Sequence, residues 1–392
     1  RDSFEKKLIN SGSNNAKMLW SLTQKKSVVL NVPLTYPVNP INGSIVSGFL
    51  TPELDEDAVY PIELADEIEM ISKGNYLFDA AGFKKYQGYD DQKLIDKVYE
   101  MSKAQYALVN HMLAKKDWDF FAHVNIGTDR MPHALWNHFD ETHPRFVKNS
   151  KFKDALKDYY IYVDGEVGKI LEKIDDDTLV IVASDHGMGK LLGRVNMNEW
   201  LMKEGYLVLK EEEKTKIIAQ TRFKLHMVDW SKTRAYSFGN YQSRIYINKK
   251  GRDPQGIVTK EEFDSLRNEL ITKINAIPDS DGKKINNSVF KTEELYPNGF
   301  IDNDAPDLLV YLGDNLWAPT DEIGSGKLYS QDTTVGKTVA VHTQFGFFII
   351  SGKGVTKRGK IDRISIMDFT PTILYALGET IPKELRGVKV NI

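Results

Sequence analysis

The 392-residue chain has no cysteine, no long hydrophobic run and no excess of basic side chains. The lack of cysteine excludes disulfide bonds and thiolate zinc sites, so any bound metal must be held by His, Asp and Glu. No apolar stretch reaches the ~18–20 residues that cross a bilayer, and no signal peptide is recognisable, so a cytoplasmic location is the default expectation. The formal net charge of −3 excludes a strongly basic surface made for a nucleic-acid polymer.

The stretch around which the chain is organised is Thr178 to Gly189, TLVIVASDHGMG. Its residues Leu179 to Ala183 are all apolar, which predicts a short strand buried on both faces. Asp185 and His186 follow this strand almost at once. Because ligands bind at the carboxyl ends of strands in open α/β sheets, this carboxylate and imidazole form a natural metal-ligand pair.

Apolar runs and helical periodicity alternate along much of the chain. Buried strands are predicted at 27–32, 119–126, 179–183, 307–311 and 345–350, and helices at 61–70, 90–115, 152–174 and 368–377. The alternation predicts an α/β fold with a mixed, mostly parallel sheet between helices. Residues 38–62 contain Pro, Asn and Gly and are predicted to form a long surface loop.

The regular pattern loosens after Val195. Short strand-like pieces and one helix follow, at 234–238, 244–248, 288–292 and 260–277. We expect residues 206–300 to form an inserted cap subdomain. Residues 1–205 and 301–392 then form the core, and the composition, 41% hydrophobic and 27% charged, is that of a globular protein of this size.

The second informative stretch is Thr128 to Trp136, TDRMPHALW, directly after the strand predicted at 119–126. If a helix begins at Asp129, then Asp129 and His133 lie one turn apart on the same face. Taken singly, Asp129 is more typical of a helix cap, and His133 of an ordinary half-buried histidine. Two Asp/His pairs at the ends of neighbouring strands are rarer by chance, so we interpret both pairs as metal ligands.

His342 supplies a fifth candidate ligand, just before the strand predicted at 345–350. A lone histidine before a strand is weak evidence for a metal ligand. It gains weight here because two Asp/His pairs are already present. The five side chains offer only nitrogen and oxygen donors, which suits zinc or manganese. They are too many for one catalytic ion and nearly enough for two ions ~3.5–4 Å apart. The set is Asp129, His133, Asp185, His186 and His342.

Ordered motifs spread over nearly the whole chain match one protein superfamily. They are VVLNVPLTYP (Val28 to Pro37), VSGFLTP (Val46 to Pro52), TDRMPHALW, SDHGMG, VDWSKTRAYS (Val228 to Ser237), IYINKKGRDPQGIV (Ile245 to Val258), APDLLVY (Ala305 to Tyr311) and DFTPTILYALG (Asp368 to Gly378). With these motifs the chain resembles the alkaline phosphatase superfamily. Within it, the chain is most similar to the type I phosphodiesterase/nucleotide pyrophosphatase branch and its microbial members described as phosphohydrolases or phosphomutases.

The resemblance implies an alkaline-phosphatase-like fold and a role for each matching residue. Asp129, His133 and His342 would hold one divalent ion, and Asp185 and His186 the other. It also implies a nucleophilic Thr or Ser and a further Asp in a first strand-and-helix unit. This chain resembles the family without that N-terminal segment, so we expect the nucleophile upstream of Arg1. The hydroxyls of Thr35 and Thr128 are interpreted instead as a turn contact and a helix cap.

The expected function is hydrolysis of phosphate esters by two metal ions, acting on phosphodiester or nucleotide pyrophosphate bonds of a small substrate. One alternative is phosphotransfer of the cofactor-independent phosphoglycerate mutase type. The large insertion between His186 and His342 argues against it, because that relative carries its insertion soon after the nucleophile. Sulfate or phosphonate esters are also open. An alternative of another class is a non-catalytic, metal-binding fragment.

A few further side chains are candidates for contact with the substrate. Arg130 suits a phosphate through its bidentate fork, although an ion pair explains it equally well. His138 follows His133 closely and is a candidate to line the pocket. Tyr236, Asn248 and Arg252 lie in the predicted cap, where they are candidates for substrate specificity. His123 and His111 are interpreted as packing residues.

Overall fold

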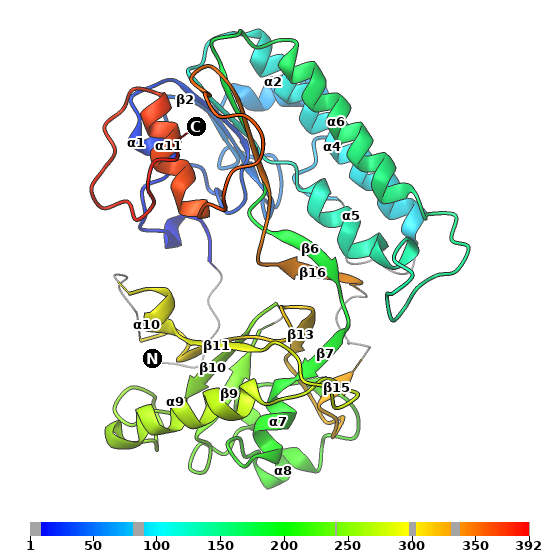
Figure 1. Cartoon of the computed structure of the whole chain (residues 1–392), viewed down its shortest axis with the longest axis vertical. Coiled ribbons are helices and arrows are strands. Elements are labelled where there is room, and N and C mark those ends of the chain that lie inside the picture. Colours follow the sequence, from blue (N-terminus) through cyan, green and yellow to red (C-terminus); the bar gives the residue numbers. More distant parts are fainter. Residues whose placement is uncertain (1–8, 81–89, 240, 298–302, 331–337, 392) are drawn as a thin grey trace. The chain divides into compact units, whose positions relative to one another are not determined.

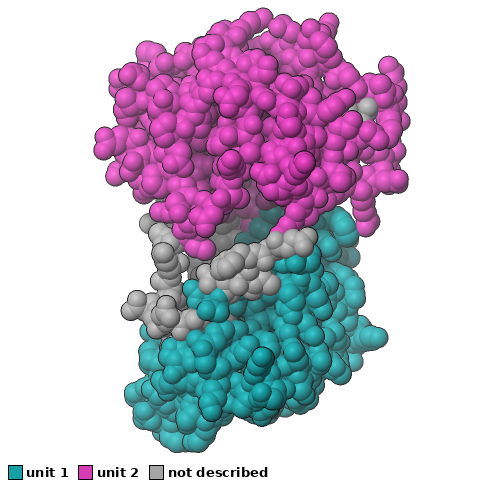
Figure 2. All heavy atoms as spheres, turned by 90° about the vertical axis from the view of Figure 1, so that its left-hand side faces the viewer, with its two compact units in different colours: residues 1–6, 136–148, 186–345 teal, residues 7–135, 149–185, 346–392 magenta. Residues whose placement is uncertain are grey.

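A computed structural model gives the fold of the chain and describes residues 9–80, 90–239, 241–297, 303–330 and 338–391. The chain forms two compact units, which Figure 2 colours separately. Unit 1 contains Trp136–Lys148 and His186–Phe345, and unit 2 contains Lys7–Leu135, Asn149–Asp185 and Gly346–Ile392. Both units combine helices with sheets that include parallel strand pairs, which confirms the predicted α/β class.

Unit 2 is built on a four-stranded sheet in the order β3-β2-β1-β4. All five residues of β1 (Ser27–Asn31) are buried, as an apolar run in a central strand predicts. β1 pairs in parallel with β2 (Gly43–Gly48) and β4 (Phe120–His123), and β3 (Val59–Tyr60) adds an antiparallel edge. Both strands that the sequence predicts in this sheet are confirmed.

The surface loop predicted at 38–62 is wrong, because β2 and β3 lie within it. Ile45 and Val46 of β2 are buried at 2% and 0% exposure. They are the only large apolar residues of the strand, so no apolar run marks it in the sequence. Gly43 permits close strand approach instead of marking a turn, since a Cβ there would lie 2.0 Å from the Ser27 carbonyl oxygen.

Three helices of unit 2 pack together on one side of this sheet (Figure 1). They are α2 (Leu64–Ser72), α4 (Asp91–Ala114) and α6 (Ala155–Leu171). The longest, α4, begins after Asp90, whose side chain accepts a hydrogen bond from the backbone N–H of Lys93. Its buried side chains recur at helical spacing along one face. This periodicity is also visible in the sequence, which predicts all three helices.

The remaining helical elements in the described part of unit 2 are mostly short. They are η1 (Ser11–Ser13), α1 (Leu19–Leu22), α5 (Gly127–Leu135), η4 (Ile366–Asp368) and α11 (Phe369–Ala376). α11 corresponds to the last helix that the sequence predicts, and it packs against α1.

The strand at the centre of the sequence interpretation, β5 (Leu179–Ala183), pairs antiparallel with β17 (Phe348–Gly352) in a separate two-stranded sheet. The strand itself is confirmed, but its predicted burial on both faces is wrong, because none of its residues is fully buried. Within the described ranges, β17 is the one strand that pairs with β5. Two apolar residues of the partner segment are exposed: Phe347, just before β17, at 54%, and Ile349, within β17, at 57%.

Unit 1 contains an antiparallel sheet in the order β11-β12-β10-β9 and a three-stranded sheet in the order β13-β7-β15. Both sheets bury apolar residues in one shared cluster with α7 and α9. Their bounds are β7 (Gly193–Asn196), α7 (Met197–Lys203), β9 (Ala235–Phe238), β10 (Ser243–Ile247), α9 (Lys260–Asn275), β11 (Ser288–Lys291), β12 (Leu308–Tyr311), β13 (Trp317–Thr320) and β15 (Tyr329–Ser330).

Smaller elements complete unit 1. They are η2 (Trp136–His138), β6 (Gly187–Lys190), α8 (Glu211–Lys214), β8 (Thr221–Arg222), η3 (Leu225–Met227), α10 (Thr292–Leu295), β14 (Glu322–Ile323) and β16 (Ala340–Thr343). β6 pairs antiparallel with β16, and β8 with β14.

Unit 1 extends beyond the cap predicted at 206–300. The reason is strand pairing. β7 precedes residues 206–300 in the chain, and it hydrogen-bonds to β13 and β15, which follow them. These long-range pairs join the flanking segments to the same compact unit as residues 206–300. Among the helices that the structure describes, none is long and apolar enough to span a bilayer.

Candidate functional site

The first Asp/His pair lies on α5 of unit 2, immediately after β4. Asp129 Oδ1 and His133 Nε2 are 3.4 Å apart, and the two side chains are 16% and 4% exposed. Pro132 also lies within this helix. The one-turn spacing predicted from the sequence is therefore confirmed. It places a carboxylate oxygen and an imidazole nitrogen side by side.

Arg130, on the same helix, donates hydrogen bonds to two carboxylates. Its Nε and Nη2 donate to Asp79 Oδ1 and Oδ2 at 2.8 and 3.0 Å, and its Nη1 donates to Asp129 Oδ2 at 3.1 Å. The Arg130 guanidinium also lies 4.4 Å from the centroid of the Phe49 ring. The ion pair that the sequence left open is thus present. Its partner, Asp79, lies 51 residues away and had no local pattern to indicate it.

A buried polar cluster holds the start of α5. Asn125 Oδ1 accepts hydrogen bonds from the Gly127 backbone N–H at 2.8 Å and from Tyr159 Oη at 3.0 Å. Asn125 Nδ2 donates to Tyr106 Oη at 3.1 Å, and Ser102 Oγ lies 2.7 Å from Tyr159 Oη. Every member is hydrogen-bonded, so the cluster rigidifies the turn that leads to Asp129 and His133.

Replacing Gly127 by alanine is expected to lower the free energy of unfolding of unit 2 by about 2 kcal/mol. A Cβ at this position would lie 1.8 Å from Tyr159 Oη, and Tyr159 is fully buried and hydrogen-bonded. Urea denaturation measures the loss. The matched control is Gly165→Ala in α6, where a Cβ meets no atom within 4 Å. A Gly127→Ala variant as stable as the Gly165→Ala variant would contradict the expectation.

The hydroxyls of Thr35 and Thr128 both donate hydrogen bonds to backbone carbonyls. Thr35 Oγ1 donates to the Val32 carbonyl at 2.7 Å, and Thr128 Oγ1 donates to the Asn125 carbonyl at 2.9 Å. Both contacts are local. The turn interpretation of Thr35 is confirmed, but the cap interpretation of Thr128 is wrong, because Thr128 lies inside α5 and its hydroxyl donates to a carbonyl instead of accepting from a backbone N–H.

Asp185 follows β5 in unit 2 and is exposed. Next to it, Ser184 Oγ accepts a hydrogen bond from the Phe347 backbone N–H at 2.9 Å. The prediction that the two Asp/His pairs follow neighbouring strands is not met. β4 pairs with β1 and β5 pairs with β17, so the two strands belong to separate sheets of unit 2.

His186 and His342 come together in unit 1. Antiparallel pairing of β6 with β16 places His342 opposite Met188, and the His186 and His342 rings stack with centroids 3.5 Å apart. The Tyr241 ring stacks on His342 at 4.3 Å. The structure therefore joins two residues that are far apart in sequence. It also adds Tyr241, which lies between β9 and β10 and had no motif to indicate it.

His138 and Tyr236, the other substrate candidates, are both buried in unit 1. His138 ends η2 and is 7% exposed. Tyr236 is 4% exposed, and its ring stacks on Tyr246 and meets the edge of Trp230. This placement gives Tyr236 a packing role in the core of unit 1.

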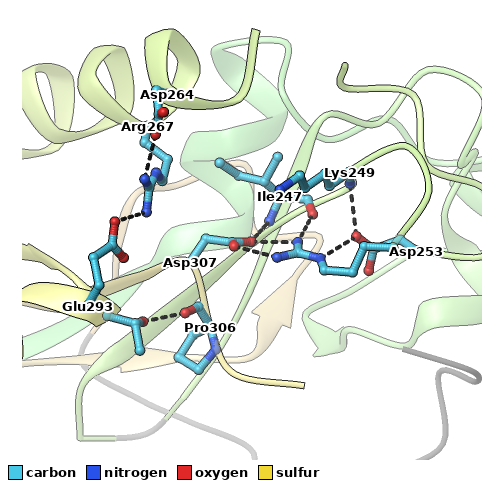
Figure 3. Close-up of polar contacts among 10 residues, drawn as sticks. Ile247, Lys249, Asp253, Asp264, Arg267, Glu293, Pro306 and Asp307 are labelled. Atoms are coloured by element: carbon cyan, nitrogen blue, oxygen red, sulfur yellow. Dashed lines mark hydrogen bonds and ion pairs between the residues drawn. The ribbon is translucent and has the colours of Figure 1, made fainter. Parts of the chain in front are cut away.

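Asn248 and Arg252 also have structural contacts. Asn248 Nδ2 donates to the carbonyls of Trp230, Thr233 and Gln255. Arg252 forms a bidentate pair with Asp307 at 2.6 and 2.8 Å, and Arg252 Nε donates to Asp253 at 3.1 Å (Figure 3). Arg252 Nη2 also donates to the Ile247 carbonyl. These contacts tie the end of β10 to the segment that leads into β12.

The ring nitrogens of His123 on β4 are buried, as the packing interpretation predicts, and the ring meets that of Tyr106 with centroids 5.2 Å apart. Among the described residues, none forms a hydrogen bond with either ring nitrogen by geometric criteria. Burial lowers the pKa of His123 to about 4, against a smaller opposing effect of the Leu30 carbonyl. His111 is half-buried, and its Nε2 lies 2.8 Å from Glu67 Oε2.

Unit 2 is expected to lose stability as the pH falls from about 6.5 to about 4. In this window the unfolded chain protonates His123 while the folded protein holds it neutral, so protons favour unfolding. The full pKa shift corresponds to a loss of about 3 kcal/mol in the free energy of unfolding. Urea denaturation at several pH values measures how this free energy changes with pH. His123→Met is expected to flatten this pH dependence of the free energy of unfolding. Identical slopes for His123→Met and the parent protein would contradict the expectation.

Comparison with known protein families decides the relationship of this chain. The family model for type I phosphodiesterase / nucleotide pyrophosphatase matches residues 6–341. The chain belongs to this family. The branch predicted from the sequence motifs is thus confirmed, and the family is one of phosphoric ester hydrolases. A search among curated proteins gave no match.

Solved structures similar to the chain include two relevant proteins. One is murine ectonucleotide pyrophosphatase/phosphodiesterase 5, with 14% identity, a TM-score of 0.40, and coverage of 71% of this chain and 60% of that one. The other is phosphonoacetate hydrolase from Sinorhizobium meliloti in complex with phosphonoacetate, with 10% identity, a TM-score of 0.41, and coverage of 83% and 65%. The chain therefore spans less than two thirds of the length of either structure.

Proposed function

We propose that the protein hydrolyses phosphate esters with the aid of divalent metal ions. The proposed bonds are phosphodiester or nucleotide pyrophosphate bonds of a small phosphorylated substrate. The observation that carries the proposal is membership of the type I phosphodiesterase/nucleotide pyrophosphatase family over residues 6–341. The Asp129–His133 pair on α5 supports it, because two ligands one helical turn apart are ready to share an ion.

We assign Asp129, His133 and His342 to one divalent ion, and Asp185 and His186 to a second. The chemistry of the donors fits such ions, because carboxylate oxygens and imidazole nitrogens suit zinc and manganese. Within unit 2, Asp129 and His133 already present their donor atoms 3.4 Å apart. Within unit 1, strand pairing and ring stacking hold His186 against His342.

The side chains around these ligands have defined tasks in the proposed site. Arg130 orients the Asp129 carboxylate and is itself held by Asp79. When bound, two divalent ions stabilise the charge on the attacking and leaving oxygens of a phosphoryl displacement. Arg130 and His138 remain proposed substrate contacts. Neither Thr35 nor Thr128 is proposed as the nucleophile, because both hydroxyls donate to backbone carbonyls.

Hydrolysis of bis(p-nitrophenyl) phosphate tests the proposed function. Full-length chain stripped with a chelator is expected to be inactive, and zinc or manganese is expected to restore release of p-nitrophenol. Stoichiometric metal binding without hydrolysis of phosphodiesters or pyrophosphates would instead support the non-catalytic alternative. Conversion of 3-phosphoglycerate to its isomer, without ester hydrolysis, would favour phosphotransfer.

A further inference from the structure

A buried arginine lies in the middle of the three-stranded sheet of unit 1. Arg194 is on β7, the central strand, and is only 8% exposed. The next residue, Val195, points into the apolar core of the unit. Because successive side chains of a strand point to opposite faces, Arg194 lies on the other face of the sheet.

The Arg194 face of β7 carries two polar groups for which the described residues provide no partner. Among the described residues, none provides a hydrogen bond or an ion pair to the Arg194 side chain, and Ser330 Oγ is buried without a hydrogen bond. Ser330, on β15, is directly opposite Arg194 in the antiparallel pair. Side chains at such positions share a face, with Cβ atoms about 5 Å apart. A guanidinium and a hydroxyl therefore meet at one spot.

The surroundings of Arg194 include a second guanidinium, that of Arg145, and a carboxylate, that of Glu322. Burial lowers the pKa of Arg194 to about 10; Arg145 adds to this shift, and Tyr241 and Glu322 oppose it. Arg194 is still a cation at neutral pH. A buried cation without a partner is costly, as is a buried hydroxyl without an acceptor. Both costs are removed by an anion that accepts hydrogen bonds from the two groups.

We propose that this face of β7 is a binding site for a compact oxyanion of the phosphate class. The Arg194 fork donates two parallel hydrogen bonds to its oxygens, and the Ser330 hydroxyl donates a third. A phosphate group fits better than a carboxylate, because the second nearby guanidinium, Arg145, favours a second negative charge. None of the five proposed metal ligands takes part in this site.

The position of the site indicates which phosphate group it receives. Tyr241 stacks on His342 and lies close enough to Arg194 to influence its pKa, so all three belong to one region of unit 1. If the proposed hydrolase function holds, Arg194 binds a phosphate of the substrate other than the reacting one. The preferred substrate then carries at least two phosphate groups, as a nucleotide-type pyrophosphate does.

Calorimetric titration of the full chain with sodium phosphate tests the site itself. The protein is first stripped of metal on a chelating resin, so that metal-bound phosphate does not contribute. Arg194→Gln is expected to weaken phosphate binding at least about tenfold. Arg194→Lys keeps the charge but not the fork, so its affinity for phosphate is expected to lie between those of Arg194→Gln and the parent protein. Ser330→Ala is expected to lower the affinity for phosphate several-fold.

Arg222→Gln is the matched control, because Arg222 is an exposed arginine of unit 1 and its loss is expected to leave phosphate binding unchanged. Should Arg194→Gln fail to fold, the parent protein supplies a second readout: phosphate raises its melting temperature more than chloride does at equal ionic strength. No phosphate binding, or equal binding by Arg194→Gln, overturns the site. Acetate binding as tightly as phosphate overturns the phosphate class.

Kinetics test the substrate preference separately. Arg194→Gln is expected to raise KM for a dinucleotide pyrophosphate at least about tenfold while leaving KM for bis(p-nitrophenyl) phosphate unchanged. Equal effects on both substrates would overturn the assignment to a second phosphate. If phosphate binding depends on Arg194 but no ester is hydrolysed, the proposed function fails and the anion site stands.

Discussion

Replacing His133 by alanine is expected to remove one of two bound metal ions and to lower hydrolysis of bis(p-nitrophenyl) phosphate by about 1,000-fold. His133 is 4% exposed on its side chain, and its Nε2 lies 3.4 Å from Asp129 Oδ1. A methyl group in its place offers no donor atom. An ion held by the remaining ligands would lose affinity and its fixed position.

Elemental analysis and initial rates measure the two effects in parallel. Asp185→Ala is expected to remove the other ion with a loss of activity of similar size, because it changes the second proposed ligand set. The matched control is His226→Ala, at an exposed side chain of unit 1, which is expected to change neither quantity. Unchanged metal content in both the His133→Ala and Asp185→Ala variants would show that these residues have structural roles instead.

Asp307→Asn is expected to lower the free energy of unfolding of unit 1 by about 3–4 kcal/mol. The side chains of Asp307 and Arg252 are 5% and 14% exposed, and the pair is bidentate. Asp307 Oδ2 also accepts a hydrogen bond from the Ile247 backbone N–H at 2.6 Å. The amide of asparagine carries no charge and has only one acceptor oxygen, so the Arg252 charge loses most of its compensation.

Urea denaturation followed by tryptophan fluorescence measures this loss, since Trp200, Trp230 and Trp317 lie in unit 1. Figure 3 also shows the matched control, Asp264, which pairs with Arg267 at the surface and is 70% exposed. Asp264→Asn is expected to cost less than about 1 kcal/mol.

A double-mutant cycle separates the value of the pair from the cost of leaving one charge alone. Arg252→Met combined with Asp307→Leu is expected to be more stable than either Arg252→Met or Asp307→Leu. Equal losses for Asp307→Asn and Asp264→Asn would contradict the structural role of the Asp307–Arg252 pair.

Much of the local structure was predictable from the sequence, because short-range patterns encode it. The apolar run at β1, the helical period of α4 and the one-turn spacing of Asp129 and His133 each depend on neighbours within a few residues. β2 was missed for the same reason: its burial comes from pairing with β1, and its own residues are mostly Gly and Ser.

The partners of the candidate site residues were decided by tertiary structure. Arg130 has its partner 51 residues away at Asp79, and Arg252 has its partner 55 residues away at Asp307. No periodicity reports such contacts, because they form only when distant segments pack together. Two substrate candidates, Tyr236 and Arg252, consequently have packing and ion-pair contacts that their sequence positions did not indicate.

The sequence by itself thus determined the α/β class, the family and the candidate ligand types, because periodicity and motifs are local and ordered along the chain. Only the tertiary structure decided which of these residues meet. It separated β4 and β5 into different sheets, stacked His186 on His342 and left Arg194 buried opposite Ser330. The physical reason is that strand pairing and burial depend on contacts between segments far apart in the chain, which the sequence pattern of any one segment does not contain.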